Sequence, residues 1–229
     1  MNYASRLQTA RPMSQASDAL WVTYRWMTLG IALTGLVALG VASSPAALEL
    51  ILGNRIVFYG LLFAQLGLVF AFSSVASRVS TALAAAMFFA YAGLTGLTLS
   101  TVFLVYTATS IATTFFVTAG AFGGLSLIGF FTKRDLSAVG RFAIFAVFGI
   151  ILASIANLFV ASSGLGFAIS VVGVIIFGAL TAYDTQKLKT LFASGEATGN
   201  LPLVGALTLY LDFINMFLFM LRLFGGRRD

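Results

Sequence analysis

The sequence predicts an all-α integral membrane protein, a bundle of seven transmembrane helices. Of its 229 residues 60% are hydrophobic and only 9% are charged, whereas soluble domains carry about 25% charged residues. Long intervals carry no charge at all, and one bilayer crossing takes about 20 apolar residues. The basic residues stand singly or in pairs between these apolar intervals, as the loop anchors of membrane proteins do.

The amino-terminal half is expected to hold four spans. Leu20–Val41 and Ile56–Val75 are single apolar runs of the length that one crossing needs. The uncharged interval 79–132 is long enough for two spans and breaks at the β-branched and small polar residues 105–110. Ala82–Phe103 and Ile111–Phe131 are therefore the third and fourth spans.

The carboxyl-terminal half is expected to hold three more. The uncharged interval 142–183 breaks at "ASSGLG", a loop signal, and so divides into Phe142–Val160 and Phe167–Tyr183. The polar stretch 187–200 is predicted to be a loop, and Leu203–Leu223 is the seventh span. Glycines at helical spacing, such as Gly120 with Gly124, are typical of membrane helices that pack closely.

The charge pattern predicts the orientation. The first 19 residues are expected to be a cytoplasmic tail without a cleaved signal, and residues 20–229 a single domain. The predicted outer loops hold only Glu49 and Arg55, and the inner loops are richer in Lys and Arg, as expected. The inner basic residues are Arg78, Lys133, Arg134, Arg141, Lys187 and Lys189. Seven crossings leave three late arginines outside, so a re-entrant last span that returns its end to the cytoplasm is the alternative.

The composition excludes several function classes. Cysteine and histidine are both absent, which rules out disulfides, Cys/His metal sites, Ser-His-Asp triads and imidazole relays. The scattered basic residues do not form the patch that nucleic-acid binding needs. Any acid–base chemistry must therefore be carried by carboxylates.

The first carboxylate of interest is Asp212, which lies inside the apolar run "LYLDFINMFLFML". An ionised Asp at the centre of a membrane helix costs about 2.5 to 3.5 kcal/mol on insertion scales. At helical spacing it shares a face with Gly205, Thr208 and Asn215. We expect this polar face to point into the bundle or a water-filled cavity, although a buried structural acid is the alternative.

The second carboxylate is Asp184, at the predicted inner end of the sixth span, with Thr181 three residues before it. A hydrated carboxylate paired to a nearby lysine is the simpler interpretation. If Asp184 and Asp212 approach each other, they should titrate jointly, and with both ionised they offer oxygen ligands suited to transient calcium binding.

Three further polar residues are candidates for the same site. Arg78 ends the second span on the side of Asp184 and could pair with it through a bidentate contact, or simply anchor the helix end. Gln65 and Asn157 are buried polar candidates that more often hold helices together than bind ligands.

Four runs resemble the Bax inhibitor-1 family, also called the transmembrane Bax inhibitor motif family. They are "GLTLS" (96–100), "TKRDLS" (132–137), "TAYDTQKLK" (181–189) and "GALTLYLDFINMFL" (205–218). The resemblance covers nearly the whole chain from Leu20 onward and is to a bacterial member. It implies seven helices with the last one central, a place in the bacterial inner membrane, and an acid-sensitive calcium leak.

The resemblance also implies roles for particular residues. Asp184 and Asp212 match a paired-aspartate pH sensor, and Arg78 is the positional match to an arginine latch on the first acid. No cofactor is expected, with calcium as the permeant ion. Thr95 stands where many relatives carry Asn or Glu, and Phe130 and Phe131 replace a tyrosine-containing run.

Other functions stay open. The chain could be an interaction protein that modulates a membrane protease or a stress response without transport, or a proton-coupled transporter. An intramembrane aspartyl protease would also pair two acids, and Tyr183–Asp184 fits its first motif, but Leu209–Leu211 replace the Gly-x-Gly before the second acid. A retinal photoreceptor needs a lysine in the seventh span, which has none.

Overall fold

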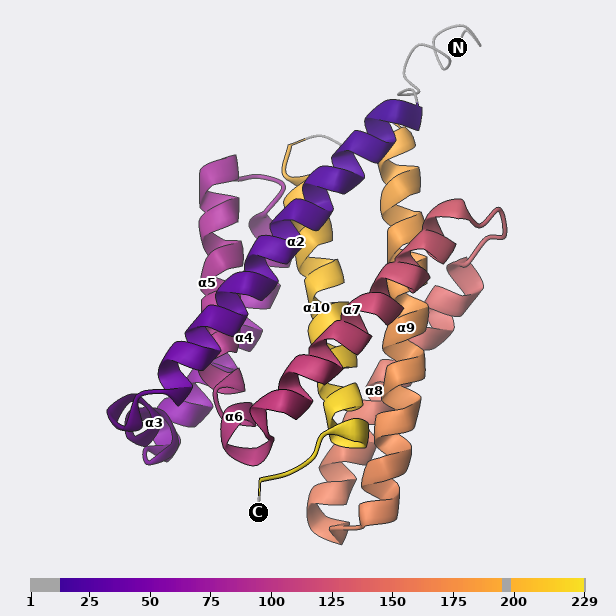
Figure 1. Ribbon diagram of the computed structural model, residues 1–229. Coiled ribbons are helices and arrows are strands. Elements are labelled where there is room, and N and C mark those ends of the chain that lie inside the picture. Colours follow the sequence, from indigo (N-terminus) through magenta and orange to yellow (C-terminus); the bar gives the residue numbers. More distant parts are fainter. Residues whose placement is uncertain (1–12, 195–198, 229) are drawn as a thin grey trace, which may run out of the picture. The chain divides into compact units, whose positions relative to one another are not determined.

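The computed structural model describes residues 13–194 and 199–228, and the tail residues 1–12, with Arg6 and Arg11, lie outside this range. The described residues form helices and no β-strand (Figure 1). The helices are α2 (Met13–Ala42), α3 (Pro45–Leu52), α4 (Arg55–Val75), α5 (Thr81–Leu99), α6 (Val102–Val105), α7 (Ala108–Phe131), α8 (Ser137–Val160), α9 (Ser163–Ala193) and α10 (Leu201–Phe224).

Seven of the described helices are long and apolar enough to cross a membrane, which confirms the predicted fold class. One predicted boundary was wrong by a wide margin: the stretch 187–200 is not a loop at its start, because α9 continues to Ala193. Residues 184–193 contain no Gly or Pro and several good helix formers. The lysines there mark where the chain leaves the apolar layer, and the helix itself extends further.

The breaks between helices carry ordinary capping chemistry. Ser44, Asn54, Ser80 and Thr107 each accept a backbone N–H of the helix that follows, which satisfies donors that a helix start leaves free. The predicted break after Val160 is made by Ala161 in the left-handed conformation, at φ 51°. Helix α3 is a short element inside a predicted connection, whereas α6 begins within the predicted third span, which α5 leaves at Leu99.

The described chain divides into two compact units. The first contains α2 to α6 together with residues 191–210, and the second contains residues 107–190 and 211–227. Helix α10 thus contributes its first part to one unit and the remainder to the other. It is also the most deeply buried of the seven membrane-length helices, with 67% of its apolar window buried against 6% for α4. The prediction of a single domain from residue 20 onward stays a prediction.

In the first unit α2 and α4 both pack against α5. Gly96 of α5 lies so close to α2 that a Cβ would stand 2.8 Å from the Thr34 carbonyl oxygen. Thr34 donates its hydroxyl hydrogen to the Ala92 carbonyl at 2.9 Å, so the Tyr210 hydroxyl, 2.7 Å from that of Thr34, must be the donor between them. Tyr210 is completely buried, and this bond satisfies its polar end.

In the second unit three glycines receive atoms of neighbouring helices. Gly129 of α7 lies against the Ala182 backbone, Gly140 of α8 against the Tyr183 ring, and Gly173 of α9 against the Phe219 ring. The glycine pair singled out from the sequence has no such role, because a Cβ at Gly120 or Gly124 would meet nothing within 4 Å. Spacing alone does not tell which face of a helix its neighbour occupies.

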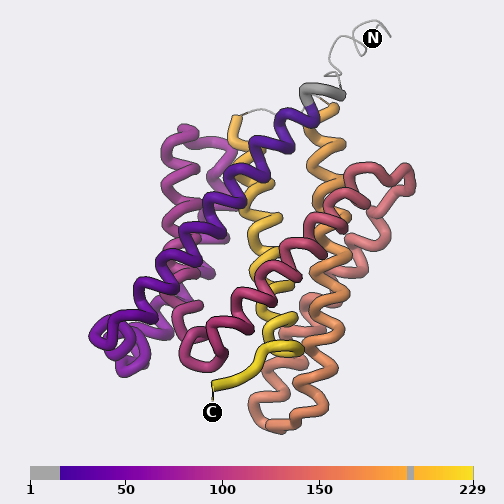
Figure 2. The backbone as a smooth tube through the Cα atoms, viewed as in Figure 1, coloured from indigo at the N-terminus to yellow at the C-terminus, as the bar shows by residue number. Residues whose placement is uncertain are grey.

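The carboxyl-terminal segment returns to the start of α7 within this second unit (Figure 2). The Thr107 N–H donates to the Gly226 carbonyl at 3.1 Å, and the Gly226 N–H donates to Ser110 Oγ at 2.9 Å. Helix α10 is unbroken over 24 residues, and a re-entrant span would need a break. An unbroken α10 that ends beside the start of α7 therefore favours a full crossing over the re-entrant alternative.

Asn200 ties the start of α10 to the end of α4 in the first unit. Its amide donates to the Ala76 and Val79 carbonyls, each at 2.8 Å, and its side chain is buried. We expect Asn200→Ala to lower the free energy of unfolding by about 1 to 3 kcal/mol, because one buried and one partly buried carbonyl lose their donor. Dodecyl sulfate titration followed by circular dichroism measures this.

Asn200→Asp is the decisive companion variant. It keeps the shape but replaces the donor with an acceptor that faces two carbonyl oxygens, so we expect at least as large a loss. An Asp variant as stable as the wild type would contradict this account of the turn.

Candidate functional site: the Asp184–Asp212 carboxyl pair

Two acidic side chains meet inside the second unit. Asp184 comes from α9 and Asp212 from α10, and their carboxyl groups lie close enough to interact with each other. The residues are 9% and 4% exposed. Asp212 Oδ2 has no hydrogen-bond partner among the described residues. The structure therefore brings together the two acids singled out from the sequence and leaves one carboxyl oxygen unsatisfied.

This contact has a chemical consequence. An ionised carboxylate only accepts hydrogen bonds, so a bond between two carboxyl groups needs a proton on one of them. Two like charges buried close together resist joint ionisation, so such a pair gains or loses its proton as a unit. The arrangement can thus hold one proton between two helices.

The hydrated-carboxylate interpretation of Asp184 was wrong. Asp184 lies within α9, nine residues before its last residue, and is buried. Lys189 does not pair with it, because its ammonium donates to the Phe130 carbonyl at 2.7 Å and lies 4.6 Å from the Phe130 ring centroid. Lys187 is close enough to act on Asp184 electrostatically, while its ammonium lies 5.9 Å from the Tyr183 ring centroid.

Gln186 and the loop between α7 and α8 hold this part of α9 in place. The Gln186 amide donates to the Arg134 carbonyl at 2.8 Å and its oxygen accepts the Leu136 N–H at 2.9 Å. With Gly129 and Gly140 packed against residues 182 and 183, the helix is fixed on both sides of Asp184. The sequence did not predict that Gln186 binds this loop. Both segments that meet here, 132–137 and 181–189, carry the family resemblance, but nothing in the sequence indicates that they are in contact.

Asp135 in the same loop is a third acid with a different role. Its carboxylate accepts the Ser137 N–H at 2.8 Å, and hydrogen bonds from Ser137 hold its pKa below the usual 3.8. The stabilisation is present above that value and is lost only as the pH falls through the lower folded-state pKa. Asp135 therefore contributes no titration near neutral pH.

The predicted supporting polar face is only partly at the acid pair. Thr181, Thr208 and Asn215 each donate to a carbonyl of their own helix, at 2.8, 3.1 and 2.8 Å, so they need no partner elsewhere.

Asn157 does not belong to this face. Its oxygen accepts the Ser162 N–H at 3.1 Å, and its amide lies beside Gly166. Gly166 is 18 residues, about 27 Å, from Asp184 along α9. Asn157 lies near the end of α8, and its side-chain oxygen caps the turn that follows this helix. For this reason it is not part of the polar face beside the acids.

Arg78 and Gln65 belong to the first unit. Arg78 is exposed beyond the end of α4, and its pairing with Asp184 stays a prediction. The Gln65 amide donates to Thr98 Oγ1 at 3.3 Å and to the Leu61 carbonyl at 3.3 Å, and its oxygen accepts from Thr95 at 3.4 Å. Gln65 thus joins α4 to α5, which favours the packing role over the ligand role.

Comparison with known proteins identifies similar chains. Residues 17–229 match the family model described as "Inhibitor of apoptosis-promoting Bax1". The "Inner membrane protein YbhL" of Escherichia coli K12 is 50% identical over 210 residues, covering 90% of each chain. An uncharacterized protein of Deinococcus radiodurans is 48% identical over 222 residues, 96% of this chain and 94% of its own. Protein RP147 of Rickettsia prowazekii is 41% identical over 211 residues, 90% and 88%.

Proposed function

Because the chain belongs to the Bax inhibitor-1 family, we propose that it is a pH-sensitive calcium leak channel of the bacterial inner membrane. The observation that supports this proposal is the contact between Asp184 and Asp212 in a buried position. A carboxyl pair that shares one proton has two charge states of different geometry, which is what a proton-controlled gate requires. The inner-membrane location rests on the printed name of the Escherichia coli relative.

In the proposed mechanism, protonation of Asp184 determines whether Arg78 holds α9 in the closed position. Near neutral pH, ionised Asp184 pairs with Arg78, and this pair closes the inner mouth. Acidification protonates Asp184, removes its attraction for the guanidinium and releases the helix. Asp212 shares the proton with Asp184 and lines the path. Gln186 holds α9 to the α7–α8 loop, so the proposed release concerns the side of α9 that carries Asp184.

Calcium is the cation that this donor set suits while passing. Carboxylate oxygens are hard ligands that calcium prefers, yet a resident calcium ion takes 6 to 8 oxygens. The described residues hold no cluster of three or more acidic, His or Cys side chains. Two carboxylates provide a brief contact with a moving ion, and no catalytic step is assigned to them.

The latch is tested with purified protein in vesicles that enclose a calcium indicator. Wild-type vesicles are expected to admit calcium faster at acidic than at neutral pH. Arg78→Gln should raise the flux at neutral pH several-fold, toward the acid level, because the closing charge pair is lost. Arg78→Lys should restore part of the closure, since an ammonium keeps the charge but loses the bidentate geometry.

Arg141→Gln is the matched control, because Arg141 is an exposed arginine on the same predicted membrane side. It is expected to leave the pH profile unchanged. Equal profiles for wild type and Arg78→Gln would remove the latch from the mechanism, and a flux no greater than that of empty vesicles at any pH would remove the channel.

A second candidate is an interaction protein that modulates a membrane partner without transport. The description of the family model, which names inhibition of another protein, favours it. Its distinguishing observation is a cellular phenotype that persists when both Asp184 and Asp212 are replaced by Asn.

A further inference from the structure

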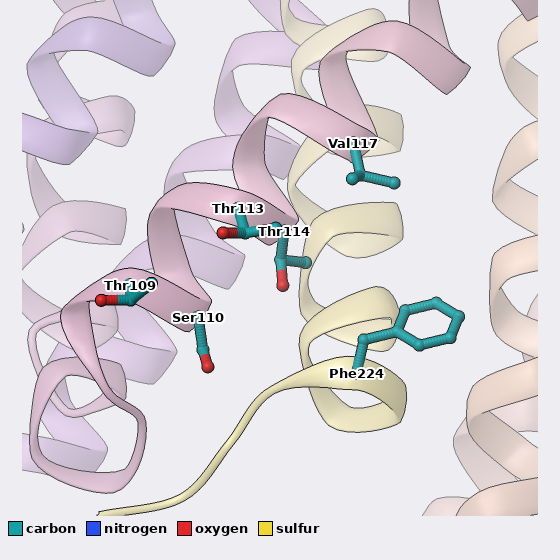
Figure 3. A pocket seen from close by; sticks show the side chains of 6 residues that line it. All are labelled: Thr109, Ser110, Thr113, Thr114, Val117 and Phe224. Carbon is teal, nitrogen blue, oxygen red and sulfur yellow. The ribbon is translucent and has the colours of Figure 1, made fainter.

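A pocket of about 350 Å³ opens at the start of α7 in the second unit, far from the acid pair. Its walls come from the first turns of α7 and from the last residue of α10, as Figure 3 shows. The lining residues are Thr109, Ser110, Thr113, Thr114, Val117 and Phe224. Four side chains that carry hydroxyl groups and two apolar side chains thus line one space.

Two hydroxyl groups of this pocket differ from most threonine hydroxyls of the membrane-length helices in their hydrogen bonding. Thr118, Thr181 and Thr208 donate to carbonyls of their own helices. Among the described residues, by contrast, the hydroxyls of Thr113 and Thr114 have no hydrogen-bond partner. Thr114 is only 4% exposed, and in Figure 3 its hydroxyl oxygen points downward while its methyl group points to the side where Phe224 lies. A hydroxyl that borders a cavity and has no partner among the described residues is free to donate to a ligand bound there.

A pocket at the start of a membrane-length helix is expected to lie near the lipid headgroups. Helix α7 begins at Ala108, and the hydroxyls from Thr109 to Thr114 extend along about 8 Å of helix. The headgroup layer on each side of a bilayer is about 5 to 8 Å thick. Val117 and Phe224 are 52% and 71% exposed, so the apolar wall is accessible to an acyl chain.

The charge around the pocket favours an anion. Arg227 directly follows Gly226, whose N–H donates to Ser110 Oγ in the pocket wall, and Arg222 is in the last turn of α10. The described acids of the second unit lie elsewhere: Asp212 is 12 residues, about 18 Å, from Phe224 along α10. The basic end of the unit thus has no described carboxylate beside it.

We propose that this pocket binds the headgroup of an anionic phospholipid in the leaflet on the carboxyl-terminal side. The hydroxyls of Thr113 and Thr114 donate to phosphate and glycerol oxygens, and Arg227 supplies the charge that favours an anionic over a zwitterionic headgroup. Val117 and Phe224 contact the first methylenes of the acyl chains. The site does not depend on the acid pair or on transport.

Native mass spectrometry of the purified protein tests the proposal, with phosphatidylglycerol and phosphatidylcholine of identical acyl chains as probes. The wild type should bind phosphatidylglycerol more tightly. The double variant Thr113→Val, Thr114→Val should bind it roughly tenfold or more weakly, because two hydrogen bonds are lost without a change of shape. Arg227→Gln should weaken phosphatidylglycerol binding alone and leave phosphatidylcholine binding as it is.

Two controls separate this site from general lipid contact. Thr190→Val removes an exposed hydroxyl that bonds its own helix, and Arg141→Gln removes an exposed arginine at the start of α8; both should bind like the wild type. Excess glycerol phosphate should not displace the lipid if the acyl chains are part of the site. Unchanged binding in the double variant, or an equal loss in the controls, would overturn the proposal, as would full displacement by glycerol phosphate.

Discussion

Asp184→Asn is expected to give vesicles whose calcium flux is high at neutral pH and nearly independent of pH. An amide at this position imitates the protonated acid, so the attraction for Arg78 is absent whatever the pH. In the wild type one shared proton can change the open fraction by at most about tenfold per pH unit, and the variant should lose this step. The measurement is indicator fluorescence in reconstituted vesicles over a pH series.

Asp212→Asn should behave differently from Asp184→Asn. An amide at position 212 can donate to Asp184 and keep it ionised, so the flux step should remain and move to lower pH. Asp135→Asn is the matched control, because Ser137 keeps the pKa of Asp135 below 3.8, outside the range of the step. Identical profiles for all four proteins would exclude the acid pair as the sensor.

Gly129→Ala is expected to lower the free energy of unfolding by about 1 to 3 kcal/mol, the usual cost of overpacking. The added methyl group would overlap the Ala182 backbone, which cannot move aside as a flexible side chain can. Because Ala182 is two residues before Asp184, α9 must shift where it carries the acid. Dodecyl sulfate titration gives the stability change, and the pH profile of calcium flux reports the displaced acid.

Gly120→Ala on the same helix is the counterpart with the opposite expected sign. A Cβ there would meet nothing within 4 Å, and Ala in a helix interior is favoured over Gly by about 0.5 to 1 kcal/mol. It should therefore be neutral or slightly stabilising. Equal destabilisation by both variants would mean that glycine content, and not the α7–α9 contact, sets the stability of this unit.

The glycines illustrate why part of the fold could be predicted and part could not. The breaks after Val105 and Val160 were visible, because turn formers interrupt apolar runs locally. The end of α9 was misplaced, because charged residues mark the membrane boundary while helix propensity continues. The contacts of Gly129 and Gly140 were missed, because a Cβ clash depends on which neighbour lies opposite, and the packing of the whole unit determines that neighbour.

The candidate site divides in the same way. A lone carboxylate in an apolar span costs free energy whatever the helix packs against, so the sequence alone identified Asp212 as a candidate site residue. The sequence alone also established the seven spans and the absence of histidine and cysteine. Only the tertiary structure decided that Asp184 is buried against Asp212, that Gln186 holds α9 to the α7–α8 loop, and that Asn157 caps a distant turn. The physical reason is range: transfer cost and turn propensity act within a few residues, whereas a shared proton or a clamp requires side chains that only the packing of separate helices brings together.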